Sequence, residues 1–99
     1  MRRGTTPTHI FNVDLDLTDA EVLFITYRQS GKTVVEKTIE DCEITTEEIR
    51  VTLSQTDTLA FSVNGQVEIQ IRAKFPDGAT VACQVIRTAA NVILKEGVI

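Results

Sequence analysis

The segment that decides the fold reads Gln66-Val67-Glu68-Ile69-Gln70-Ile71-Arg72-Ala73-Lys74-Phe75. Apolar residues occupy every second position, and polar or charged residues fill the positions between them. Because successive side chains of a β-strand point to opposite faces, this alternation predicts a strand with one buried face. Pro76-Asp77-Gly78 is typical of a turn, so residues 80–88 are expected to return as the hairpin partner, with one face formed by Val81, Cys83 and Val85.

Other segments carry the same kind of signal. Strands are expected at residues 10–17, 21–29, 32–39, 42–45 and 48–54. Ser30-Gly31 and Asn64-Gly65 are typical of tight turns. Residues 55–61 are expected to form a bend or one helical turn that plugs an end of the core. Residues 89–95 are expected as a further strand, although their pattern also fits a short helix.

The alternation also assigns faces to these strands. In residues 10–17, Val13, Leu15 and Leu17 share one face, and Asn12, Asp14 and Asp16 share the other. Residues 21–29 place apolar groups on both faces, which is typical of a central strand covered on both sides near its start. The expected core consists of Phe24, Ile25, Val51, Leu53, Val67, Ile69, Ile71 and Phe75.

Composition supports an all-β fold. Val, Ile and Thr together make up 35 of the 99 residues, and such β-branched side chains suit a pleated sheet. We expect less than about 15% helix and a single immunoglobulin-like β-sandwich of about seven short, mostly antiparallel strands. The sandwich is expected to span residues 9–99, after a loose N-terminal arm at residues 1–8. The chain has no Trp, so the Cys…Trp…Cys pattern of antibody domains is absent.

Charge and hydropathy restrict the partners. The net charge of −4 argues against nucleic acid, whose phosphates favour a basic surface. The chain has no run of 18 apolar residues, so no membrane partner is expected, and Arg2 and Arg3 are not followed by the apolar segment of a secretory signal. Acidic residues concentrate at residues 36–48, a pattern most often seen on a solvated surface. A cation site or a docking surface for a basic partner is the alternative.

Catalytic, metal and cofactor sites are not expected. His9 is the only histidine, and Ser30, Ser54 and Ser62 all lie outside a Gly-x-Ser-x-Gly motif, so a hydrolytic triad is not indicated. His9 is instead expected at a strand edge. We therefore predict a protein that is not an enzyme and holds no cofactor.

The candidate metal ligands are equally sparse. Asp14 and Asp16 are expected on the wet face of a strand, and the calcium-loop pattern that begins at Asp14 lacks its glycine and its final glutamate. Cys42 and Cys83 have no Cys-x-x-Cys spacing and are expected to be two free thiols, with Cys83 as a small core residue. A looser Ca²⁺ site at one end of the sandwich stays open as an alternative.

Five segments resemble the small β-sandwich structural proteins of tailed phages and prophages of Firmicutes, especially clostridial ones. They are residues 1–8, 16–22, 53–61, 65–72 and 94–99. The layout is similar to the N-terminal domain of phage baseplate upper proteins, although the helical linker and receptor-binding module of those proteins are missing. The resemblance implies a non-catalytic virion, tail or baseplate component, made in the bacterial cytoplasm, whose partners are other phage structural proteins or further copies of itself.

Two further expectations follow. A small ligand-binding sandwich, for carbohydrate or Ca²⁺, is the alternative function. The apolar pair Val98-Ile99 near the end of the chain is expected either to pack on its own domain or to dock on a neighbouring subunit by adding main-chain hydrogen bonds to a sheet edge.

Overall fold

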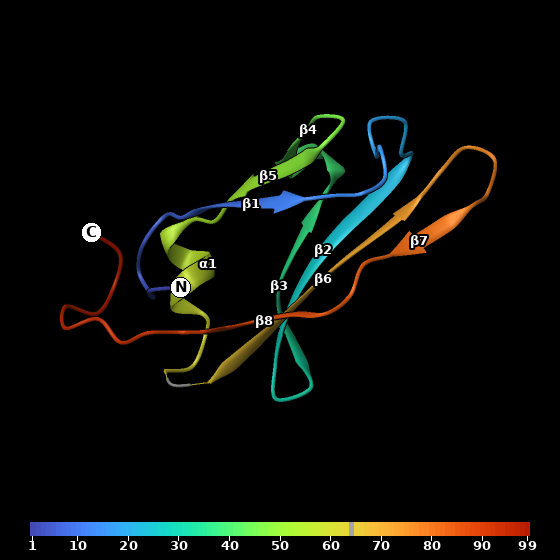
Figure 1. Ribbon diagram of the computed structural model, residues 1–99. Helices are drawn as coiled ribbons and strands as arrows, with labels where there is room; N and C mark the ends of the chain where they lie inside the picture. The colour runs from blue at the N-terminus through green and yellow to red at the C-terminus, as the bar shows by residue number, and fades with distance from the viewer. Residues whose placement is uncertain (64) are drawn as a thin grey trace.

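The computed structural model describes residues 1–63 and 65–99, and these form two antiparallel sheets packed face to face (Figure 1). The first sheet has the order β1-β5-β4 and consists of β1 (Thr8–Asn12), β5 (Glu48–Thr52) and β4 (Cys42–Ile44). The second has the order β3-β2-β6-β7 and consists of β3 (Lys32–Thr38), β2 (Val22–Gln29), β6 (Gln66–Lys74) and β7 (Thr80–Ala82), with β8 (Ile86–Ala89) also paired to β6. The predicted all-β sandwich is confirmed.

The strand order is that of an immunoglobulin variable-type sandwich. In that fold, strands B, E and D form one sheet, and strands C′, C, F and G lie in the other. Here β1, β5 and β4 take the places of B, E and D, and β3, β2 and β6 take those of C′, C and F. The place of G is taken by β7 and β8, which pair with successive parts of β6.

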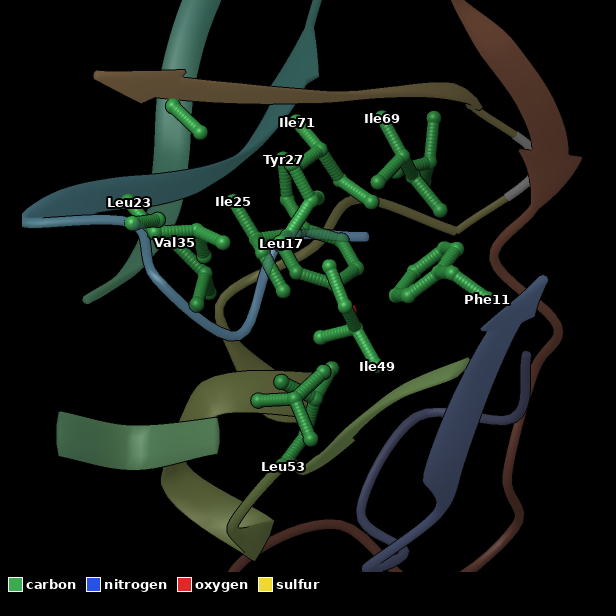
Figure 2. Close-up of a cluster of buried hydrophobic side chains, with 14 of the residues drawn as sticks. Phe11, Leu17, Leu23, Ile25, Tyr27, Val35, Ile49, Leu53, Ile69 and Ile71 are labelled. Atoms are coloured by element: carbon green, nitrogen blue, oxygen red, sulfur yellow. The ribbon is translucent and has the colours of Figure 1, made fainter. Parts of the chain in front are cut away.

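The core lies between the sheets and is built from alternate strand residues (Figure 2). The six expected core residues that are buried are Ile25, Val51, Leu53, Val67, Ile69 and Ile71. The prediction for Phe24 is wrong, because this side chain is 39% exposed. It lies opposite Thr38 and Arg72 on the outer face of the second sheet, so β2 is buried on one face only. Phe75 is partly buried and packs against the core.

The strand expected at residues 10–17 is shorter than predicted. β1 ends at Asn12, and Asp16 then forms a local turn in which Oδ1 accepts hydrogen bonds from the backbone N–H and the hydroxyl of Thr18, at 2.9 and 2.6 Å. An Asp side chain that bonds the backbone two residues on competes with strand pairing. Leu17 is buried, as expected, but Leu15 is exposed, because the chain here is a loop.

The segment expected as one strand at residues 80–88 is divided in two. The register is Arg72 opposite Ala82 in β7, and Ile69 opposite Ile86 in β8, so the outer strand holds one extra residue between them. This is the arrangement of a β-bulge. Cys83 fills the irregular stretch: its N–H donates to the carbonyl of Ile71, and its Sγ accepts from the N–H of Ile71 at 3.2 Å.

Residues 89–95 form neither the expected strand nor a helix. β8 ends at Ala89; the N–H of Ala90 still donates to the carbonyl of Gly65, and Asn91 forms an isolated parallel bridge to Arg2. Ala90 is buried, whereas Val92 and Leu94 are exposed. Two alternating apolar residues without a facing sheet have nothing to pack on, so the alternation here does not produce a strand.

The N-terminal arm is not loose. Thr8 belongs to β1, and the preceding residues are hydrogen-bonded to the end of the chain. The amino group of Met1 donates to the carbonyl of Ala89, the N–H of Asn91 donates to the carbonyl of Met1, and the N–H of Arg3 donates to the carbonyl of Asn91. The arm thus bonds main-chain groups at the outer edge of β8 and just beyond it. The residue pattern of the arm does not reveal these bonds, because the partners lie at the other end of the chain.

The turns and the helical plug are close to expectation. Ser30 and Gly31 both have positive φ, at 50° and 77°, as a two-residue hairpin loop requires. The turn signal at Asn64-Gly65 lies partly outside the described residues. The expected helical turn is α1 (Gln55–Leu59), and a 3-10 helix, η1 (Ile39–Asp41), is the other helical element described, so the low helix content is confirmed.

Candidate functional site

A groove runs along one side of the sandwich, between edge strand β1 and edge strands β7 and β8. A cavity of about 550 Å³ lies between the β1–β2 loop and β7. A second, of about 520 Å³, lies between β1 and β8. The two share Phe11, Asn12 and Ile86 as lining residues, so they form one continuous depression, which we call the side groove.

The lining of the side groove is mainly apolar. Its floor is made by Phe11, Leu17 and Ile71, which belong to the core. Its rim carries exposed aliphatic side chains: Ile10 is 50%, Leu15 48% and Ile86 41% exposed. Exposed apolar residues gathered around a depression, rather than scattered singly, are typical of a surface that another chain covers.

The β1 wall also presents free main-chain groups. Two backbone hydrogen bonds lie just beyond the ends of the β1–β5 pairing. The N–H of Leu53 donates to the carbonyl of Pro7, and the N–H of Val13 donates to the carbonyl of Glu47. In an antiparallel pair, the residues that bond the neighbour alternate with residues that do not. The odd-numbered residues of β1 therefore bond β5, and the N–H and C=O groups of Thr8, Ile10 and Asn12 are directed to the side groove.

The opposite wall is partly occupied. The N–H of Cys83 donates to the carbonyl of Ile71, and the N–H of Phe75 donates to the carbonyl of Ala79. By the same alternation, the main-chain groups of Thr80 and Ala82 therefore point away from β6. On β8, the corresponding edge is covered at Ala89 by the N-terminal arm. The arm thus closes one end of the open side, and the groove lies beyond it.

The loop that borders the groove is acidic. Residues 13–21 contain Asp14, Asp16, Asp19 and Glu21 and no Lys or Arg. Asp14 lines the groove, and Asp16 is engaged by Thr18, whose hydroxyl and backbone hydrogen bonds hold the pKa of this carboxyl below its ordinary value. An occupant that carries a basic residue is favoured at this end.

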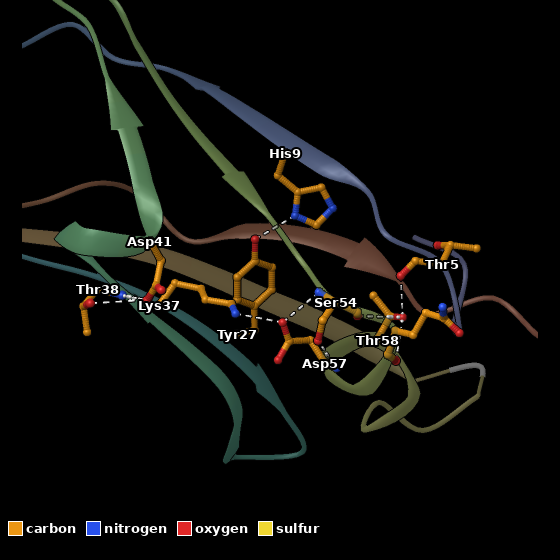
Figure 3. Close-up of polar contacts among 10 residues, drawn as sticks. Thr5, His9, Tyr27, Lys37, Thr38, Asp41, Ser54, Asp57 and Thr58 are labelled. Carbon is orange, nitrogen blue, oxygen red and sulfur yellow. Dashed lines mark hydrogen bonds and ion pairs between the residues drawn. The ribbon is translucent and has the colours of Figure 1, made fainter. Parts of the chain in front are cut away.

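His9 lies in the half of the groove next to β8 and is half-buried (Figure 3). Its Nδ1 shares a hydrogen bond of 2.7 Å with the hydroxyl of Tyr27, a fully buried residue. Burial lowers the pKa of His9, and the positive charge of the Met1 amino group lowers it further. Burial also raises the pKa of Tyr27, with smaller contributions from Cys42 and Asp57. Both groups are therefore neutral at pH 7, and the pair satisfies buried polar atoms.

On the other side of the sandwich, Lys37 Nζ and Asp57 Oδ2 form an ion pair at 2.8 Å that ties β3 to α1 (Figure 3). Asp57 also accepts from the N–H of Ser54, whose hydroxyl in turn accepts from the N–H of Asp57, which is a reciprocal helix cap. Partial burial by itself raises the pKa of Asp57. The hydrogen bonds from Lys37 and Ser54 outweigh it, so the pKa lies below its ordinary value.

The structure does not bring His9 together with any of the three serines considered from the sequence. Ser30 lies in the β2–β3 turn, and Ser54 caps α1. The N–H of Ser62 donates to the side chain of Gln29 at 2.7 Å. Since the ring of His9 bonds Tyr27 instead, these residues do not form a triad.

The candidate metal ligands also lie apart. Among residues 1–63 and 65–99, no group of three His, Cys, Asp or Glu side chains is placed to hold a metal ion. Within the acidic run, Asp41 accepts from the N–H of Thr38 at 2.9 Å and so caps η1. Cys42 and Cys83 are free thiols, both half-buried. Burial and the charge of Asp41 raise the pKa of Cys42, so its thiol is protonated at pH 7.

Comparisons with known proteins assign the chain to no family. No protein-family model and no curated protein match the chain. Among solved structures, the V domain of amphioxus IgVJ-C2 is similar, with a TM-score of 0.38 and 14% sequence identity over 92% of this chain and 97% of that one. A similarity of this size carries no inference about function. No helix in the described part of the chain is both long and apolar enough to cross a membrane.

The sequence reasoning did not find the side groove. It placed Leu15 on the buried face of a strand that ends three residues earlier, and it treated residues 80–88 as regular. The available signal was Asp16-Leu17-Thr18, where Asp stands two residues before a backbone N–H that it can bond. The buried hydroxyl of Thr58, which donates to the carbonyl of Thr5 at 2.8 Å, was also missed, because Thr is common on exposed turns.

Proposed function

We propose that this chain is a non-catalytic assembly module that acts through protein–protein contacts, as a building block of a tailed phage or prophage particle. The observation that carries the proposal is the side groove, where an apolar depression lies beside unpaired strand edges. On this proposal the chain is located in the virion, after its synthesis in the bacterial cytoplasm. The phage part of the proposal is supported by the sequence resemblance alone.

The side groove is suited to a strand of another protein. In strand addition, main-chain hydrogen bonds to a free edge provide affinity, and pockets for alternate side chains provide specificity. Both parts are present: Thr8, Ile10 and Asn12 offer the edge, and the cavities beside them offer apolar pockets. Exposed edges usually carry protective features, such as Pro or inward charges. β1 contains neither, since its sequence is Thr8-His9-Ile10-Phe11-Asn12.

The polar side chains that could perform chemistry have structural partners. His9 bonds Tyr27, Asp57 caps α1 and binds Lys37, and Asp16 forms a turn with Thr18. A catalytic site needs groups that converge on one point and are free to meet a substrate. This distribution supports a role in contacts rather than in catalysis.

The composition of purified particles tests the proposal. Tailed particles induced from the source bacterium should contain the chain at a fixed copy number, measured by quantitative mass spectrometry. A Leu15→Arg variant, which places a charge on the groove rim, should be depleted from particles. Val22→Asp, at an exposed apolar position on the outer face of the second sheet, is the matched control and should be incorporated normally. Particles that lack the wild-type chain would contradict the proposal.

A ligand-binding sandwich is the second candidate, and the groove volume favours it. Cavities of about 300–1,000 Å³ are typical of small-molecule sites. The polar side chains on the lining are Asn12, Asp14 and Gln84 near β7 and Thr8, His9 and Thr88 near β8, and the Phe of the lining, Phe11, is buried. A carbohydrate site needs an exposed aromatic ring and several converging polar groups. Titration calorimetry with sugars and with Ca²⁺ should therefore give no heat of binding.

A further inference from the structure

We infer that the side groove receives an extended segment of a different protein, which runs antiparallel to β1. From its N-terminal end, this segment carries a basic residue, an apolar residue, a variable residue and a second apolar residue. The inference rests on the proposed function, because it describes the partner that the open edge of β1 receives. It goes further in assigning the direction and the side-chain chemistry of that partner.

The outer edge of β1 is the place of a further strand. In the immunoglobulin fold, the sheet that holds strands B, E and D also contains strand A, which lies beside B. Here β1 takes the place of B, and no strand among residues 1–63 and 65–99 pairs with its other edge. The N-terminal arm pairs next to β8 instead, through the bridge between Arg2 and Asn91. Because the β1–β5 and β4–β5 pairs are antiparallel, an added strand is expected to run antiparallel to β1.

The free main-chain groups fix which side chains of the added strand point into the groove. Residues directly opposite one another in an antiparallel pair lie on the same face of the sheet. Thr8, Ile10 and Asn12 offer their N–H and C=O groups to the added strand, and their side chains are exposed. The side chains of His9 and Phe11 are on the inner face, where His9 is half-buried and Phe11 is buried. The residues opposite His9 and Phe11 therefore also point inward, two positions apart.

The surroundings of these two inward positions favour aliphatic side chains. The residue opposite His9 faces the cavity that Ile69 and Ile86 line. Phe11 lines both cavities, so the residue opposite it also meets the cavity next to β7, where Ile71 lies on the floor. Burial of aliphatic side chains against such walls is favourable.

The charges beyond the two ends of β1 differ in sign and determine which end of the partner is basic. Beyond its C-terminal end, residues 13–21 carry four carboxylates and no basic residue. None of the four takes part in the ion pairs found in the described part of the chain. Beyond its N-terminal end, the arm carries two arginines. An antiparallel partner enters at the acidic end, so a Lys or Arg is favoured opposite Asn12, diagonal to Asp14 and within reach of a long side chain.

Residues 1–99 do not supply this partner themselves. The order of a Lys or Arg, an apolar residue, any residue and a second apolar residue occurs at residues 50–53 and 72–75. The apolar residues of both segments are buried in the protein's own core or pack against it, namely Val51, Leu53, Ala73 and Phe75. In the exposed end of the chain, Lys95 is followed by Glu96, which would place a carboxylate in the apolar groove. The partner is therefore a different protein and not a second copy.

A nuclear magnetic resonance titration of the isotope-labelled full chain with a synthetic peptide tests the inference. The probe is acetyl-Lys-Leu-Thr-Leu-Thr-amide, which has the length of β1 and the inferred order of side chains. It should bind saturably, shift the amide signals of Thr8, Ile10 and Asn12, and slow their hydrogen exchange. The same peptide with Glu in place of Lys is the matched probe. It should bind at least about threefold more weakly, the effect expected from one exposed ion pair.

Variants of the protein and a labelled probe test the charge and the direction separately. Asp14→Asn should bring the affinities for the two probes closer together. Glu40→Gln, which removes an exposed carboxylate on η1, is the matched control and should leave their ratio unchanged. A nitroxide on the N-terminal end of the lysine probe should broaden the amide signal of Leu15 more than that of Thr6. The reverse order would mean a parallel strand and would overturn the inference.

The remaining outcomes concern other occupants of the groove. No saturable binding of the lysine probe up to about 5 mM, or equal binding of both probes, would overturn the inference. Protection of the three β1 amides in the dilute chain alone would assign the groove to a segment of the same molecule. Protection that rises with the concentration of the chain alone would assign it to a second copy, and either result would also overturn the inference. None of these results bears on the particle-composition experiment, which decides the proposed function separately.

Discussion

The two long sides of the sandwich differ in how they are closed. On one side, η1 carries the chain from β3 across to β4, and the Lys37–Asp57 ion pair joins β3 to α1. On the other side, β1 faces β7 and β8 across the side groove, and the N-terminal arm closes one end only. Both sides border the same core, so the open side is not a consequence of poor packing. The groove and the exposed apolar residues on its rim therefore distinguish the β1 side of the sandwich from the side of β3 and β4.

The largest effect is expected in the core that both sides share. Ile49 is fully buried and packs between the sheets (Figure 2), so Ile49→Ala should lower the free energy of unfolding by about 2–5 kcal/mol. Leu15→Ala, on the groove rim, removes a half-exposed side chain and should change it by less than about 0.5 kcal/mol. Urea denaturation of both variants measures the contrast. Equal losses would mean that Leu15 belongs to the core and that the side is not open.

On the closed side, Asp57→Ala should cost about 1 kcal/mol at pH 7, because it removes both a helix cap and an ion pair. The pKa of Asp57 is lowered in the folded protein, so its contribution is present above the unfolded pKa of about 4 and is lost as the pH falls through the folded value. Denaturation at pH 7 and at pH 2.5 should therefore show a difference between wild type and variant that shrinks in acid. A difference that persists at pH 2.5 would exclude the charge as its cause.

On the open side, a smaller pH dependence of the same sign, but at higher pH, is expected from His9. Folding lowers the pKa of His9, so as the pH falls below about 6.5 the unfolded chain binds a proton more readily than the folded one, and stability decreases. His9→Gln keeps a side chain that can bond Tyr27 and removes the titration. The melting temperature should fall more between pH 7.5 and pH 5.5 for the wild type than for the variant. Equal falls would assign the effect to other groups.

The burial and contacts of a residue could be predicted from the sequence where its packing partner could also be recognised there. Val67, Ile69 and Ile71 alternate within a long strand, and their burial followed from that pattern alone. Phe24 has the same apolar character, but its exposure depends on whether anything covers the outer face of β2, which no local pattern states. The N-terminal arm was misread for a similar reason, since its partners at Ala89 and Asn91 lie at the far end of the chain.

The candidate site was the least predictable part. The side groove exists because β1 stops at Asn12 and because one extra residue interrupts the pairing between β7 and β8. Both are departures from regular alternation, whereas sequence reasoning finds strands by regular alternation. The expectation that Val98 and Ile99 take part in docking came from their apolar, β-branched character, and it stays a prediction.

The central claim is that β1 receives a strand of another chain, and amide hydrogen exchange at Thr8, Ile10 and Asn12 tests it most directly. These N–H groups point away from β5, so they should exchange rapidly in dilute monomer. In the assembled state they should become protected, and those of Phe24 and Thr26 on β2 should not change. Association without added protection at these three amides would contradict the account.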